Sequence, residues 1–194
     1  AHLEKNGVLG INLMSSPGSG KTALLEAISE VSDLQFSVVE GDLETSRDAD
    51  RLKAKNIPAV QIQTGTACHL DAFMVHKGLH NIDLNSSDVC FVENVGNLVC
   101  PAAYDVGMHL NIVLVSVPEG SDKIAKYPVM FRVADLVLIT KTDLLPYFEY
   151  DIEHEKAEAR KLKPNVDILE VNIKDTKSVQ NVIEWIKFKQ KMRA

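Results

Sequence analysis

Residues 15–22 read "SSPGSGKT" and decide the fold of this chain. An apolar run, Val8–Met14, comes directly before them, and apolar residues on one helical face, within Thr22–Val31, come directly after. A buried strand that ends in a glycine-rich turn and leads into a helix is the setting of a phosphate-binding loop, or P-loop. A glycine-rich turn with a chance lysine is the alternative, but the order strand, loop, Gly-Lys-Thr and helix favours the P-loop.

The residue types in this loop suit the binding of phosphate groups. Glycines allow backbone N–H groups to turn inward around phosphate oxygens, and the start of the helix adds a partial positive charge. In such a loop Lys21 reaches the β- and γ-phosphates, and the Thr22 hydroxyl binds Mg²⁺. The strict pattern has glycine where this chain has Ser15. The residues predicted to contact the nucleotide here are Gly18, Ser19, Gly20, Lys21 and Thr22.

Strand-like and helix-like segments alternate along the rest of the chain. Residues 88–94 "DVCFVEN", 111–117 "NIVLVSV" and 134–140 "ADLVLIT" are apolar on both faces, as in a parallel sheet covered by helices. The sequence therefore predicts an α/β P-loop NTPase with a mostly parallel, doubly wound sheet and helices on both faces. No repeat or linker interrupts it, so we predict one domain over residues 1–194. Ligands are expected at the carboxyl ends of the strands.

Composition argues against several classes of function. The chain has 21 Lys and Arg against 27 Asp and Glu, a formal charge of −6, so we expect neither nucleic acid nor an anionic membrane as a partner. No apolar run has the length of a membrane span, and the first ten residues lack the basic and apolar regions of a signal peptide. Three widely spaced cysteines indicate a reducing cytoplasm rather than a disulfide framework.

The segment "TKTD", Thr140–Asp143, predicts which base the nucleotide carries. Guanine is read by Asn-Lys-x-Asp at the end of a strand, and this segment ends the sixth predicted strand. The Asp143 carboxylate can accept hydrogen bonds from the ring N–H and the exocyclic amine of guanine, a pair that adenine does not offer. The stem of Lys141 can cover the base. We predict GTP rather than ATP, although Thr140 replaces the usual Asn and a charged turn is the alternative.

Two carboxylates at strand ends are candidates for the magnesium shell. Asp42 ends the second predicted strand and Glu93 the fourth, so both face the nucleotide edge of the sheet. Magnesium needs hard oxygen ligands and keeps several waters, so one or two carboxylates suffice. We predict that both residues hold Mg²⁺, directly or through water, and take part in catalysis with Lys21. Helix capping by Asp42 and a structural hydrogen bond by Glu93 are the alternatives.

The segment that follows Glu93 suits a nucleotide-dependent change of conformation. Gly96 would let the backbone move towards a γ-phosphate and retreat after hydrolysis. The sequence offers no evident arginine to stabilise charge on the transferred phosphate. We therefore expect slow turnover, because such an arginine is worth about 10³–10⁵ in rate.

Cys68, His69 and Cys100 form a candidate transition-metal site. Cys68 and His69 follow the third predicted strand in "TGTACHLDA", and Cys100 lies seven residues beyond Glu93 at the same sheet edge. Thiolates and imidazole suit nickel or zinc, although an adjacent Cys-His pair is by itself more often packing. Three ligands leave the site incomplete, and a symmetric dimer would supply a second set. The remaining histidines, which are predicted to form no comparable cluster, are His2, His76, His80, His109 and His154.

Taken together, the motifs resemble the HypB family, the hydrogenase-maturation nickel-insertion GTPases. The segments that carry the resemblance are "SSPGSGKT", "EGDLETSRDADR", "TGTACHLDA", "ENVGNLVCP", "EGSDKIAKYP" and "TKTDL", in family order from Val8 to Leu144. The resemblance implies a GTPase domain of the MinD-like branch with an embedded metal site. It implies that Lys126 crosses a dimer interface towards the other subunit's nucleotide, with a solvated helix lysine as the alternative. Asn172 and Lys174, in "NIKD", would supply a weak fifth guanine loop.

The resemblance also implies a function and partners. Such proteins deliver Ni²⁺ to the apo form of the NiFe-hydrogenase large subunit with a HypA-type nickel chaperone, and some also support urease. They dimerise when GTP is bound, with the equivalents of the two cysteines and His69 at the interface. The family's N-terminal Cys-x-x-Cys-Gly-Cys motif and histidine-rich stretch are missing here, so no separate nickel site is predicted. A UreG-type urease GTPase, a MinD-like ATPase and a non-catalytic metal-storage protein are the alternatives.

Overall fold

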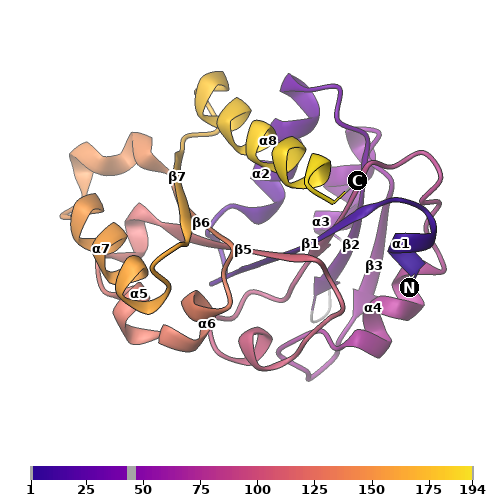
Figure 1. The fold of residues 1–194 in the computed structure, drawn as a ribbon, viewed down its shortest axis with the longest axis horizontal. Coiled ribbons are helices and arrows are strands. Elements are labelled where there is room, and N and C mark those ends of the chain that lie inside the picture. The colour runs from indigo at the N-terminus through magenta and orange to yellow at the C-terminus, as the bar shows by residue number, and fades with distance from the viewer. Residues whose placement is uncertain (1, 43–46, 194) are drawn as a thin grey trace.

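The computed structural model describes residues 2–42 and 47–193. Seven strands form one sheet in the order β3-β2-β4-β1-β5-β6-β7, and every neighbouring pair is parallel (Figure 1). The strands are Leu9–Ser15 (β1), Phe36–Asp42 (β2), Ala59–Gln63 (β3), Val89–Glu93 (β4), Leu110–Ser116 (β5), Leu136–Thr140 (β6) and Asp167–Val171 (β7). The predicted parallel α/β sheet is confirmed.

Helices cover both faces of this sheet, so neither face is left to solvent (Figure 1). One face is covered by α2 (Lys21–Val31), α3 (Arg47–Ala54) and α8 (Thr176–Lys191). The other is covered by α1 (His2–Lys5), α4 (Ala72–Leu79), α5 (Lys123–Lys126), α6 (Pro128–Arg132) and α7 (Ile152–Leu162). Three 3₁₀ helices, η1 (Cys100–Ala103), η2 (Val117–Glu119) and η3 (Thr142–Tyr147), lie in loops.

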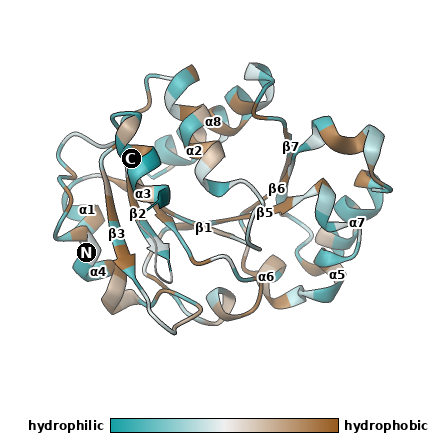
Figure 2. Cartoon of the chain, turned by 180° about the vertical axis from the view of Figure 1, so that it is seen from behind, coloured by the Kyte–Doolittle hydropathy of each residue, from teal (hydrophilic) through white to brown (hydrophobic). Residues whose placement is uncertain are grey.

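The strands are apolar on both faces because each face packs against helices. In β1, Ile11 and Leu13 lie in the cluster that contains α2 and α8, whereas Met14 lies in the cluster formed with α5, α6 and α7. Side chains alternate between the two faces of a strand, so neighbouring residues enter different clusters. Figure 2 shows hydrophobic colour along β3, whereas α7 carries much hydrophilic colour. Burial of this kind is the main source of stability for the sheet.

Strand order and register bring the chemical side chains to one edge. The P-loop leaves the carboxyl end of β1, and the neighbouring β4 ends at Glu93, which pairs with Leu13 in β1. On its other side β4 pairs with β2, where Glu40 lies opposite Glu93. The carboxyl ends of these three central strands therefore surround the P-loop, as expected for a ligand site in an open α/β sheet.

Several short elements were not expected from the sequence. Among them are α1, η1 and the break between α5 and α6 at Tyr127, which is followed by Pro128. Proline has no backbone N–H to continue the hydrogen bonds of a helix, so it begins a new one here. None of the helices in the described part of the chain is both long and apolar enough to cross a lipid bilayer.

Candidate nucleotide and metal site

The P-loop lines a cavity of about 500 Å³ at the carboxyl edge of the sheet. Lys21 is only 9% exposed, and its ammonium donates a hydrogen bond to the Ser15 hydroxyl at 3.1 Å. Ser15 in turn donates to the carbonyl of Ser16 at 2.6 Å, so its hydroxyl fits the loop in place of the usual glycine. Burial lowers the pKa of Lys21, and the nearby Glu93 carboxylate opposes that shift. The cavity thus holds a buried cation suited to phosphate.

Thr22 and Glu93 meet inside this cavity, although 71 residues separate them. The Thr22 hydroxyl donates to Glu93 Oε1 at 2.7 Å, and Glu93 is 4% exposed. Its Oε2 atom is buried and makes no hydrogen bond within the described chain. Burial raises the pKa of Glu93, whereas Lys21 and the Thr22 bond lower it. Asp42 lines the same cavity. A hydroxyl and two carboxylates are oxygen ligands of the kind that Mg²⁺ accepts, so these residues fit that ion.

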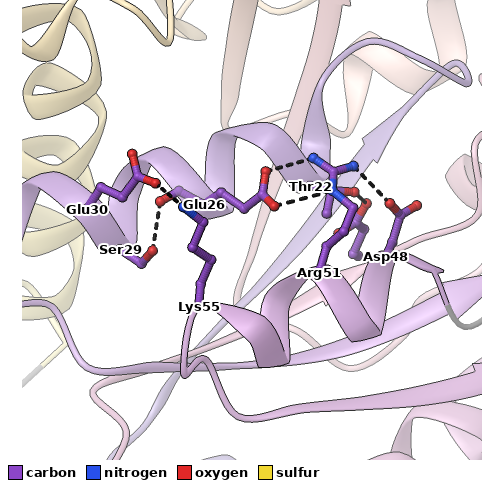
Figure 3. Close-up of polar contacts among 8 residues, drawn as sticks. Thr22, Glu26, Ser29, Glu30, Asp48, Arg51 and Lys55 are labelled. Carbon is purple, nitrogen blue, oxygen red and sulfur yellow. Dashed lines mark hydrogen bonds and ion pairs between the residues drawn. The ribbon is translucent and has the colours of Figure 1, made fainter.

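Glu40 and Arg51 also line this cavity, and sequence analysis missed both. Glu40 is 2% exposed, and burial, with the neighbouring Glu93 charge, raises its pKa to about 8. Arg51 places a guanidinium at this cavity, where two carboxylates already engage it. It reaches from α3 to Glu26 on α2 at 2.7 Å and also pairs with Asp48 at 3.1 Å (Figure 3). The sequence signal for the position of Arg51 was its spacing from Asp48, because residues three apart on a helix can form an ion pair. Residues 43–46, in the same segment, lie outside the described residues.

A second cavity of about 300 Å³ lies beside the P-loop. Lys141, Asp143 and Lys174 line it. The Thr140 hydroxyl donates to the carbonyl of Ser19 at 2.7 Å, so the threonine that replaces the usual Asn joins this loop to the P-loop. The Lys141 ammonium donates to the carbonyl of Gly18 at 2.6 Å. These two hydrogen bonds hold the loop that begins at Thr140 against the P-loop.

The two residues of the "NIKD" segment have different positions. The Lys174 ammonium lies 3.1 Å from Asp143 Oδ2 and pairs with that carboxylate. Asn172 instead stabilises its own turn, because its Oδ1 accepts the Lys174 backbone N–H at 2.9 Å. The structure therefore places Lys174 at the second cavity and gives Asn172 a local structural contact.

Glu119 is a further polar anchor of the P-loop that sequence analysis did not single out. Its carboxylate accepts hydrogen bonds from the hydroxyls of Ser16 and Ser19, the latter at 2.8 Å. It also accepts from the backbone N–H and hydroxyl of Ser116 at the end of β5, both at 2.7 Å. The acidic side chain thereby fixes the serine side of the P-loop to the sheet.

The predicted convergence of Cys68, His69 and Cys100 is confirmed. Their ligand atoms all lie within 4.8 Å of one another, and each residue is half-buried. The two sulfur atoms are 2.7 Å apart and both cysteines are free thiols, while Cys68 Sγ lies 3.9 Å from His69 Nδ1. The hydrogen bond from the Cys68 thiol to the Cys100 sulfur raises the pKa of the Cys68 thiol. Two soft sulfurs and one imidazole at this spacing suit nickel or zinc.

Tyr104 is an aromatic neighbour of this cluster that the sequence did not reveal. Its ring stacks on the ring of His69, with centroids 3.7 Å apart and planes 12° from parallel. Tyr104 follows η1, the short helix that begins at Cys100. Stacking restricts the rotation of the imidazole and so helps to orient it beside the sulfurs.

The segment between Glu93 and Cys100 touches both the P-loop and the metal loop. Asn94 Oδ1 accepts the backbone N–H of Leu70, next to His69, at 3.1 Å. Gly96 packs so closely on Pro17 that an added Cβ would lie 2.9 Å from its Cα atom. Asn97 donates its N–H to the Ser15 carbonyl at 2.8 Å, and its Oδ1 accepts the N–H of Cys100 at 3.2 Å. One continuous set of contacts therefore joins the two sites.

Lys126 and the other histidines lie away from both cavities. Lys126 is exposed on α5 and pairs with Asp122 at 2.8 Å. Within the described residues only the cysteine cluster forms a group with all its ligand atoms within 4.8 Å, as predicted. The rings of His2, His76 and His80 nevertheless lie near one another, with centroids 4.5–6.3 Å apart. They lie together because α1 packs beside α4 in the same hydrophobic cluster.

Comparison with protein families agrees with this geometry. The family model described as "CobW/HypB/UreG, nucleotide-binding domain" matches residues 10–170. The hydrogenase/urease maturation factor HypB of Helicobacter hepaticus is 51% identical over 188 residues, which cover 95% of this chain and 78% of that protein. The hydrogenase maturation factor HypB of Azotobacter vinelandii is 45% identical over 188 residues, which cover 96% of this chain and 62% of that protein.

Solved structures show the same similarity in three dimensions. HypB from Helicobacter pylori, crystallised in complex with nickel, superposes with a TM-score of 0.95 and 45% identity, covering 98% of this chain and 91% of that chain. HypB from Archaeoglobus fulgidus superposes with a TM-score of 0.89 and 36% identity, covering 97% of this chain and 93% of that chain.

Proposed function

Because the chain belongs to the CobW/HypB/UreG family, we propose that it is a GTP-hydrolysing nickel chaperone that inserts Ni²⁺ during maturation of NiFe hydrogenase. One observation carries this proposal. The Cys68, His69 and Cys100 cluster is joined to the nucleotide cavity through Asn94 and the segment that ends at Cys100. A nucleotide switch with no metal role would not require two thiols and an imidazole at this position.

GTP would occupy the two adjoining cavities of the structure. Gly18, Ser19 and Gly20 would surround the phosphates, and Lys21 would neutralise their charge. The base would lie in the second cavity, beside Lys141 and Asp143. Both cavities would belong to a single GTPase domain. The Asp143 carboxylate would accept the two guanine donors after Lys174 moves aside. The MinD-like ATPase alternative is less well supported, since adenine lacks that donor pair.

Hydrolysis would depend on the charged groups of the first cavity. Thr22, Asp42 and Glu93 would hold Mg²⁺, which supplies positive charge at the β- and γ-phosphate oxygens when bound. Lys21 would stabilise the negative charge that develops on the γ-phosphate. Arg51 would reach the phosphates only by leaving Glu26 and Asp48, so slow turnover is expected.

Nickel is the cargo in this proposal. The three ligands of one chain leave a coordination site incomplete, so a second copy of the chain would complete it when GTP or metal binds. Lys126, which is exposed, would face the partner's nucleotide in such a dimer. GTP would draw the segment from Glu93 to Cys100 into one conformation and change metal affinity, and metal would change GTP affinity by the same factor.

The proposed partners are a HypA-type nickel chaperone and the apo-hydrogenase large subunit, in the cytoplasm. Urease is a second candidate recipient, since the Helicobacter relatives are named hydrogenase/urease maturation factors. A UreG-type urease GTPase is the less favoured alternative, because its Cys-Pro-His metal motif is absent from this sequence. The three free cysteines suit a reducing compartment.

Nickel titration of the apo, GDP-bound and GTP-analogue-bound protein tests the proposal, with molecular mass measured by light scattering on the same samples. We expect nickel affinity to differ between the GDP and GTP-analogue states by about 5- to 150-fold, the usual range of coupling between sites. We also expect the mass to double in the analogue state. The same nickel affinity and the same mass in all three states would refute the coupling.

Asp143→Asn should change the base preference of the protein. An amide cannot accept both guanine donors, so GTP affinity should fall by about 10- to 100-fold, the value of a hydrogen bond to a charged group. Binding of xanthosine triphosphate should improve, because its carbonyl can accept from the new amide. Competition binding with a fluorescent nucleotide measures both changes. Glu184→Gln, an exposed change on α8, is the matched control, and unchanged GTP affinity in Asp143→Asn would exclude Asp143 from base recognition.

A further inference from the structure

Three histidines gather at the end of α4, away from the cysteine cluster. His76 lies in the last turn of α4, and His80 follows as its C-terminal cap. His2, on α1, brings its ring centroid within 4.9 Å of the His80 ring and 6.3 Å of the His76 ring. Residues 76 and 80 are four apart, so they project from the same side of the helix. No step of the proposed GTPase cycle uses these side chains.

The distance between the two helical imidazoles matches that of a chelating pair. His76 Nε2 and His80 Nε2 are 3.1 Å apart. A metal ion about 2.0–2.1 Å from each nitrogen would then see them at an angle of about 100°, between the octahedral and tetrahedral values of roughly 90° and 109°. A hydrogen bond between the rings needs one donor and one acceptor nitrogen. A metal ion would accept a lone pair from each neutral ring instead.

The electrostatic surroundings also favour a cation. The carboxyl end of a helix carries partial negative charge from its last carbonyl groups, and both helical histidines lie there. Lys77 is turned towards Phe73, with its ammonium 4.4 Å from the centre of that ring.

We propose that His76 and His80, with His2 as a third ligand, bind one divalent transition-metal ion such as nickel or zinc. Within the described chain only the cysteine cluster has all its ligand atoms within 4.8 Å of one another, so the His2 ring would turn to bring a nitrogen to the ion. Water would complete the coordination. The two metal sites would then lie at opposite ends of α4, whose eight residues span about 12 Å. This second site contains no thiol.

A variant without the cysteine cluster tests the second site. In full-length Cys68→Ser/Cys100→Ser protein, calorimetric titration with Ni²⁺ should still show one ion per chain. Adding His76→Ala and His80→Ala should weaken this binding by at least about tenfold, and His2→Ala should weaken it less. His154→Ala is the matched control, because His154 is an exposed histidine on α7, and it should leave binding unchanged.

A second measurement tests the same site without the cysteine substitutions, in case the cysteine variant folds poorly. In the chain with its cysteines intact, His76→Ala/His80→Ala should remove one Ni²⁺ per chain and leave the thiolate-to-nickel charge-transfer absorption unchanged. Three results would overturn the proposal: no Ni²⁺ bound by folded cysteine-free protein, equal binding with and without the two helical histidines, or binding only in a dimer. None of these results depends on GTP hydrolysis, so the proposed GTPase function is tested independently of this site.

Discussion

Lys21→Met is expected to reduce GTP hydrolysis by about 10²–10³-fold, the usual effect of removing one preorganised electrostatic contact to a transition state. The ammonium of Lys21 is buried beside Ser15 and close to Glu93. Methionine keeps much of the volume of the lysine side chain but removes its positive charge. The developing charge on the γ-phosphate would then face an acidic cavity without that compensation. Phosphate release under single-turnover conditions measures the loss directly.

Nucleotide binding and stability separate this effect from a folding defect. Lys21→Met should also bind GDP more weakly, because the lysine contacts the β-phosphate in the proposed complex. Lys177→Ala, an exposed lysine on α8, should match the parent protein in both assays. Circular dichroism should show the same secondary structure in all three proteins. Hydrolysis by folded Lys21→Met within fivefold of the parent rate would exclude the proposed role of Lys21.

Cys100→Ala is expected to weaken nickel binding by roughly 100-fold while GDP binding stays within about twofold of the parent value. The Cys100 sulfur lies 2.7 Å from that of Cys68, so its loss removes one of two soft ligands. The phosphate cavity does not include Cys100, so the nucleotide contacts should persist. Competition with a nickel-binding dye and titration with a fluorescent GDP analogue measure the two affinities.

Cys90 offers the matched control for this experiment. It is fully buried in β4, and burial raises the pKa of its thiol to about 11. Its sulfur lies in the hydrophobic cluster with α1 and α4 and is not part of the group formed by Cys68, His69 and Cys100. Cys90→Ala should lower stability slightly through lost packing but leave nickel affinity unchanged. If Cys100→Ala bound nickel as tightly as the parent, Cys100 would not be a ligand.

The proposed coupling between the two sites would depend on contacts that only the folded chain reveals. Asn94 follows Glu93 in sequence, yet its side chain binds the backbone beside His69 on a different loop. Thr64, in the loop that carries Cys68, donates its backbone N–H to the carbonyl of Asp42 at 2.9 Å. A change in the position of Asp42 or Glu93 would therefore shift the loop that carries Cys68 and His69. The shift would pass through these hydrogen bonds rather than through the hydrophobic core.

The sequence was sufficient to predict most of the fold. Apolar runs placed the central strands β1, β4, β5 and β6, since a strand buried on both faces must be apolar along most of its length. The P-loop could be located because its glycines, lysine and threonine follow one another in the chain. The short helices α1 and α5 escaped prediction, because four residues are too few to show a helical period.

The amino-acid sequence by itself determined most of the elements, the phosphate-binding loop and the candidate metal ligands, because these depend on residue types and spacing along the chain. Tertiary structure decided which strand ends meet. Only the strand order places Glu93 against Thr22 and Thr140 against Ser19, and only the packing of α1 beside α4 brings His2 to His76. Such contacts join residues far apart in the chain, where local periodicity carries no information, and so they follow from the burial of the helices on the sheet.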